Sequence, residues 1–76
     1  MSDDEMLAIL KQLCAAYMSN DRGTTQRLEP KATEIGEELH LRGGMREMQR
    51  IFGLLGGIPG WRTLEMHWDG IGNWRG

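Results

Sequence analysis

Apolar residues recur every three or four positions near the start of the chain, and this spacing is typical of an amphipathic helix. Ser2 and Glu5 have the spacing of a capping box, in which each side chain satisfies a free backbone N–H group at a helix start. The residues that form the apolar stripe are Met6, Ile9, Leu10, Leu13, Cys14 and Tyr17. The pattern predicts a first helix over residues 3–18, and Gly23 closes the turn-forming segment that follows it.

A second apolar stripe follows with the same spacing, and it consists of Leu28, Ala32, Ile35 and Leu39. Thr24 or Thr25 can cap this second helix at its start. Pro30, however, favours a place in the first turn, so helical geometry is expected from about Glu29 onward. The end of the helix is clearer, because the sequence Arg-Gly-Gly at 42–44 combines a last-turn cation with a glycine cap.

Two further helices are predicted in the second half of the chain. The first covers residues 45–55, and its apolar face consists of Met45, Met48, Ile51, Phe52 and Leu55. The sequence Gly-Gly-Ile-Pro-Gly at 56–60 must end it, because glycine and proline are poor helix formers. A short helix over residues 60–69 would then align three apolar side chains on one face, those of Trp61, Leu64 and Trp68.

These elements define the expected fold class. No segment alternates apolar and polar residues as a strand does, so the sequence predicts an all-α protein. Helices that are joined by short loops usually pack roughly antiparallel to one another. We expect one domain over residues 1–76. Its architecture should be a compact bundle-like or orthogonal array of three to four short helices. A chain of 76 residues buries only a thin core, which its three tryptophans and six methionines would have to fill.

Charge and cysteine content bear on the binding partners and the cellular compartment of the protein. The net charge is −2, and eight of the eleven acidic residues lie within residues 1–38, which argues against nucleic-acid binding driven by phosphate contacts. The single cysteine cannot form an internal disulfide. No basic signal-like start and no apolar run near the ~20 residues that cross a bilayer are present. We therefore expect a cytoplasmic protein that does not enter the membrane.

No arrangement of side chains in the sequence predicts catalysis, cofactor binding or metal binding. Cys14 falls on the apolar stripe of the first helix, where a thiol is usually an inert small hydrophobe. His40 and His67 have none of the spacings that zinc sites use. The expectation is therefore a non-enzymatic protein with no cofactor and no metal.

Two groups of residues are candidates for binding. Trp74 lies beyond the last helical stripe with Arg75 beside it, and tryptophan and arginine are favoured anchors at protein interfaces. The alternative is that Trp74 pins the tail to the core. Arg42, Arg46 and Arg50 recur every four residues and could present a cationic strip to an anion, although a solvated surface is the commoner explanation of such a pattern.

These candidates lead to two hypotheses of function. The first is a small protein-interaction module, and a homodimer through helix one is one form of this hypothesis, because Leu7 and Met18 widen the apolar stripe there. The alternative is a weak nucleic-acid or phosphate-binding protein that uses the Arg/Trp surface. The segment from Leu64 to Trp74 resembles parts of small bacterial proteins, and this resemblance implies no particular activity.

Overall fold

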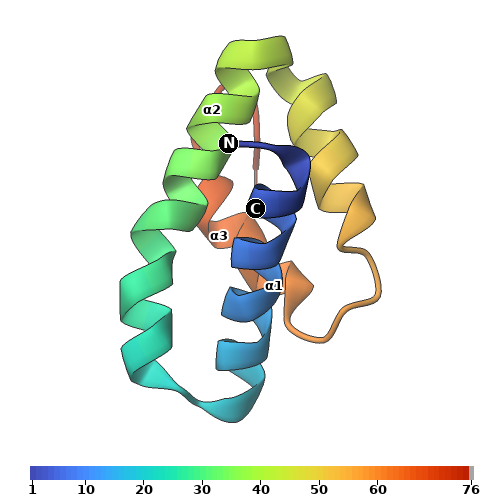
Figure 1. The fold of residues 1–76 in the computed structure, drawn as a ribbon. Helices are drawn as coiled ribbons and strands as arrows, with labels where there is room; N and C mark the ends of the chain where they lie inside the picture. The colour runs from blue at the N-terminus through green and yellow to red at the C-terminus, as the bar shows by residue number, and fades with distance from the viewer. Residues whose placement is uncertain (76) are drawn as a thin grey trace.

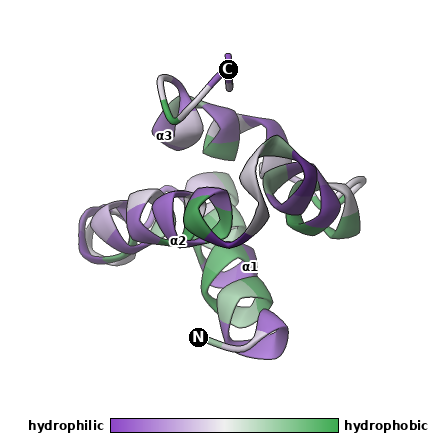
Figure 2. Ribbon diagram, turned by 90° about the horizontal axis from the view of Figure 1, so that it is seen from above, coloured by the Kyte–Doolittle hydropathy of each residue, from purple (hydrophilic) through white to green (hydrophobic). Residues whose placement is uncertain are grey.

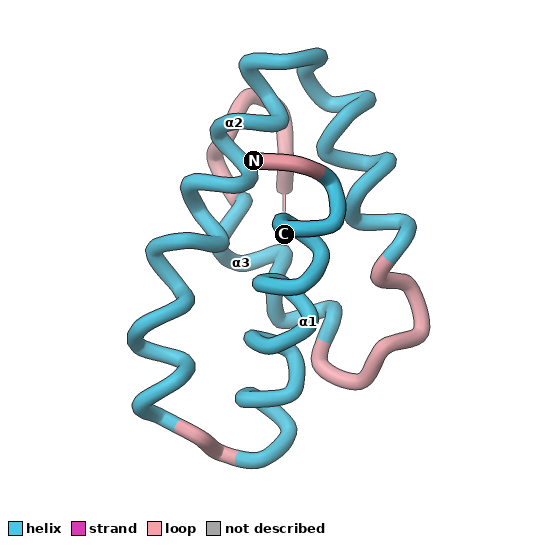
Figure 3. Tube along the Cα trace, in the orientation of Figure 1, coloured by secondary structure: helices cyan, strands magenta, loops and turns pink. Residues whose placement is uncertain are grey.

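The chain folds into an all-α array, which confirms the predicted fold class. In a computed structural model that describes residues 1–75, the elements in chain order are α1 (Asp3–Ser19), α2 (Arg22–Leu54), the 3-10 turn η1 (Trp61–Leu64) and α3 (Glu65–Trp68). Within residues 1–75 there is no strand. Loop segments are confined to the short turn after α1, the stretch between α2 and η1, and the two ends of the described chain (Figure 3).

Helix α1 matches its prediction and is one residue longer. The Ser2 hydroxyl accepts a hydrogen bond from the Glu5 backbone N–H at 3.1 Å, and the Glu5 carboxylate accepts one from the Ser2 backbone N–H at 3.4 Å. This capping box fixes the start of the helix. Asn20 ends it in the left-handed conformation, with a φ of 56°.

The predicted start of the second helix is wrong. Helix α2 begins at Arg22, because the Asp21 side chain caps it by accepting hydrogen bonds from the Thr24 backbone N–H at 3.1 Å and the Thr24 hydroxyl at 2.7 Å. Pro30 therefore lies inside the helix and not in its first turn. Its side chain is exposed, so water can reach the carbonyl that loses its helical partner.

Two glycines divide α2 into a first limb (22–42) and a second limb (45–54), and the sequence predicted the break at these glycines. Gly43 and Gly44 both have non-helical backbone angles, and Gly44 has a φ of 65°. Figure 1 shows α1 descending, the first limb rising beside it, and the second limb descending again after the bend. The break lets one long helical element contribute two sides of the array.

Apolar side chains from every element meet in one core, and α1 is visibly more hydrophobic than α2 (Figure 2). Each predicted helical stripe contributes to it. The buried hydrophobic residues are Met6, Leu10, Leu13, Cys14, Ala16, Leu28, Ala32, Ile35, Leu39, Met48, Ile51, Phe52, Leu55, Leu64, Trp68 and Trp74.

An aromatic cluster joins the C-terminal segment to α2. The Phe52 ring lies 5.0 Å from the ring of Trp61, 5.9 Å from that of Trp68 and 5.3 Å from that of Trp74. The Trp68 indole N–H also donates a 2.9 Å hydrogen bond to the Ala32 carbonyl. The last segment therefore closes over the first limb and the second limb together.

Candidate functional site

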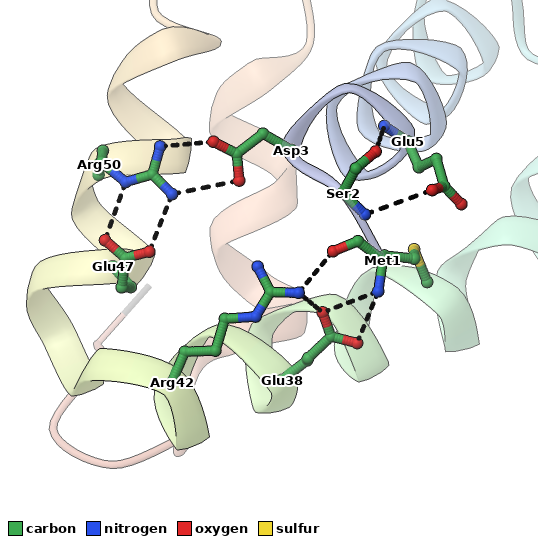
Figure 4. A network of polar contacts seen from close by, with 8 residues as sticks. All are labelled: Met1, Ser2, Asp3, Glu5, Glu38, Arg42, Glu47 and Arg50. Atoms are coloured by element: carbon green, nitrogen blue, oxygen red, sulfur yellow. Dashed lines mark hydrogen bonds and ion pairs between the residues drawn. The ribbon is translucent and has the colours of Figure 1, made fainter.

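Arg50, one of the predicted binding residues, is held by two carboxylates. Its guanidinium contacts Asp3 Oδ2 at 2.8 Å and Glu47 Oε1 at 2.8 Å, and Figure 4 shows both contacts. These hydrogen bonds raise the pKa of Arg50 and lower the pKa of Asp3 and of Glu47. Arg50 thus ties the start of α1 to the second limb of α2.

Arg42 takes part in a second network beside the first (Figure 4). Its Nη2 lies 2.6 Å from Glu38 Oε2 and also donates to the Met1 carbonyl. The same Glu38 oxygen lies 3.3 Å from the N-terminal amine. Arg42 therefore fixes the N-terminus against the first limb of α2.

The structure does not assemble the predicted Arg/Trp surface. Arg42 and Arg50 each face carboxylates that offset their charge, which makes them poor phosphate ligands. Trp74 is only 8% exposed and packs against Phe52, so the prediction that it forms an exposed anchor is wrong. Among residues 1–75, Arg46 and Arg75 are exposed and form no ion pair.

A cluster of three titratable side chains, which the sequence did not suggest, connects α1, α2 and α3. The Tyr17 hydroxyl donates to Glu29 Oε2 at 3.2 Å and lies 2.5 Å from His67 Nε2. His67 Nε2 is also 3.3 Å from Glu29 Oε2. The three residues were missed because they are far apart in the sequence.

This cluster is better suited to holding the helices together than to catalysis. Burial and the Glu29 charge both raise the pKa of Tyr17, so its hydroxyl stays protonated and is a weak base or nucleophile. Burial likewise raises the pKa of the Cys14 thiol, which is fully enclosed in the core. Neither group is placed as a reactive centre.

An apolar groove lies between α1 and the segment that follows α2. It has a volume of about 360 Å³, and its lining residues are Lys11, Ala15, Met18, Ser19, Ile58 and Pro59. We call it the Met18 groove, because the Met18 side chain is 62% exposed there. Ile58 and Pro59 were expected only to interrupt a helix. Leu7, the other residue that was expected to widen the apolar stripe for a homodimer, packs instead against the core.

Two smaller cavities are more polar at their edges. One, of about 200 Å³, lies where α1 meets α2, and its lining includes Tyr17, Asn20 and Arg22. The other, of about 290 Å³, lies between the first limb and the tail, with Glu37 and His40 in its lining. The Met18 groove is larger than both and has the more apolar lining.

Comparisons with known protein families, curated proteins and solved structures give no match for this chain. Within the part of the chain that the structure describes, no helix combines the length and the apolar character needed to cross a bilayer. The described residues thus form a small all-α protein with an apolar groove beside α1.

Proposed function

We propose that this protein is a small cytoplasmic interaction module that binds an apolar segment of another protein in the Met18 groove. The observation that carries the proposal is the groove itself, where four lining residues, Ala15, Met18, Ile58 and Pro59, present apolar surface to solvent. Methionine adapts its shape easily and is common at surfaces that bind other proteins. A groove beside a helix also matches a recurring way in which proteins bind helical segments.

Two further observations support a binding role over catalysis or phosphate binding. The titratable cluster formed by Tyr17, Glu29 and His67 satisfies its own hydrogen bonds, and the Cys14 thiol is enclosed. The carboxylates beside Arg42 and Arg50 weaken the alternative of a nucleic-acid or phosphate-binding surface.

The proposed location in the cytoplasm rests on the cysteine content. The single cysteine, Cys14, is a free thiol enclosed in the core, and free thiols are common in the cytoplasm.

A matched pair of variants tests the proposal. Met18→Glu places a charge in the groove, whereas Met66→Glu places one at a methionine that is 69% exposed and lines none of the three cavities. Each tagged protein is used to capture partners from the native lysate, and its circular dichroism and melting temperature are checked first.

The expected result is a specific captured protein that is lost with Met18→Glu and retained with Met66→Glu, both variants being folded. Equal capture by all three proteins would contradict the proposal, because the groove would then make no difference. The absence of any specifically captured protein, together with a monomeric mass in solution, would contradict it as well.

A further inference from the structure

The Met18 groove extends along α1. Lys11, Ala15 and Met18 are separated by four and three residues, so they lie on the same side of the helix, along about 10 Å of its axis. Ile58 and Pro59 form the opposite side. A second helix laid beside α1 could place apolar side chains from successive turns into a groove of this shape.

Lys11 gives the groove a charge preference. It is the one charged residue among those that line the groove, and within residues 1–75 its ammonium forms no ion pair. Asp4 lies seven residues earlier in α1, about 10 Å away along the axis, which is too far for a direct contact. An occupant with a carboxylate opposite Lys11 would complement this charge.

The same charge disfavours a second copy of the chain as the occupant. A two-fold dimer brings the same surface together on both sides, so two Met18 grooves would face each other. Their linings contain a lysine and no acidic residue, so neither copy offers a carboxylate to the other within the groove. The homodimer expected from the sequence is therefore the weaker alternative.

We infer that the Met18 groove binds an acidic amphipathic helix of a partner protein, with apolar side chains against Met18 and Ile58 and a carboxylate facing Lys11. This inference rests on the proposed function, since it names the kind of partner that the groove would bind. The contact at Lys11 is exposed, so its contribution to binding should weaken as salt screens it.

The test uses three synthetic helical peptides of about 18 residues, long enough to form helix in isolation. They share one leucine face and differ only in the flanking residues, which are glutamate, glutamine or lysine. Each is titrated into the wild-type protein and into Lys11→Glu, Met18→Glu and Lys31→Glu. The last variant reverses the charge of an exposed lysine that does not line the groove and so controls for net charge. Affinity and the amide chemical shifts of α1 and residues 55–60 are recorded.

The expected result is that the glutamate peptide shifts the groove amides and binds the wild-type chain about two- to fivefold more tightly than the glutamine peptide. Lys11→Glu should reverse the order of the glutamate and lysine peptides, Lys31→Glu should preserve it, and Met18→Glu should abolish binding. High salt should bring the three affinities together.

Three results would overturn the inference. Equal binding of the three peptides in the groove would show that the groove has no preference for an acidic helix. The proposed function would still agree with that result, because the groove would bind an apolar helix face. Self-association that is lost with Met18→Glu would identify a second copy as the occupant. If no peptide shifts the groove amides, the inference fails, and the lysate capture then decides separately whether the proposed function survives.

Discussion

At the scale of single residues, the absence of a side chain at Gly36 lets the C-terminal segment pack against α2. A Cβ at this position would lie 2.7 Å from the Trp68 indole and 2.9 Å from Ile71 Cδ1. The indole cannot easily move, because its N–H is bonded to the Ala32 carbonyl. Gly36→Ala should therefore cost about 1–3 kcal/mol of unfolding free energy, measured by urea denaturation.

Gly53→Ala is the matched control for that prediction. Gly53 is also in α2, but a Cβ there meets no atom within 4 Å. Since alanine is the better helix former, this variant should gain up to about 1 kcal/mol. A loss of stability in both variants, or in neither, would contradict the packing role of Gly36.

Trp68 and Trp74 are both buried, yet their indole N–H groups differ. The Trp68 N–H is bonded, whereas the Trp74 Nε1 is buried without a hydrogen-bond partner in the described structure. Replacement by phenylalanine keeps an aromatic ring and removes the N–H in each case. Trp68→Phe should cost about 1 kcal/mol more than Trp74→Phe in urea unfolding, because it also removes the hydrogen bond to the Ala32 carbonyl. Equal losses would show that the hydrogen bond contributes little.

At the scale of helical elements, the bend of α2 depends on a backbone conformation that suits glycine. Gly44 has a φ of 65° and a ψ of −148°, a region that residues with a Cβ avoid, although no atom would obstruct a Cβ there. Gly44→Ala should therefore destabilise the fold by about 1–3 kcal/mol through backbone strain alone. The melting temperature should fall, while the circular dichroism stays helical. An unchanged melting temperature would show that the bend tolerates other conformations.

The sequence predicts elements well where one local signal dominates. The capping box at Ser2 placed the start of α1 correctly, and the glycines at 43–44 placed the end of the first limb correctly. The start of α2 was missed because two local signals disagree there. The position of Pro30 favoured a later start, whereas the Asp21 cap and the Tyr17–Glu29 contact stabilise the earlier turns.

At the scale of the whole molecule, the contacts that decide the candidate site join distant parts of the chain. Arg50 meets Asp3 across 47 positions, so the sequence could present the arginine as a free binding group. Trp74 falls outside every helical stripe, and its burial follows from the backbone turn that returns it to Phe52. The Met18 groove likewise needs the docking of residues 58 and 59 beside α1, which spacing within either segment does not reveal.

The network around Arg50 also gives the whole molecule a pH dependence. Hydrogen bonds hold the pKa of Asp3, Glu47 and Asp21 below their usual range, with Arg50 as the partner of the first two and Thr24 as that of the third. A carboxyl whose pKa is lower in the folded state stabilises the fold above its unfolded pKa of about 4, and this contribution disappears as the pH falls through the folded value. The melting temperature should therefore decrease between about pH 5 and pH 2.

Arg50→Gln should flatten this decrease, because it removes the main partner of both Asp3 and Glu47 and leaves chiefly the Asp21 contribution. Arg46→Gln makes the same change of charge in the same limb at a residue that forms no ion pair within residues 1–75, so it should keep the wild-type slope. Thermal unfolding from pH 2 to pH 7 at low ionic strength measures how the melting temperature of each variant depends on pH. Equal slopes for the two variants would mean that the tie between α1 and the second limb does not control acid stability.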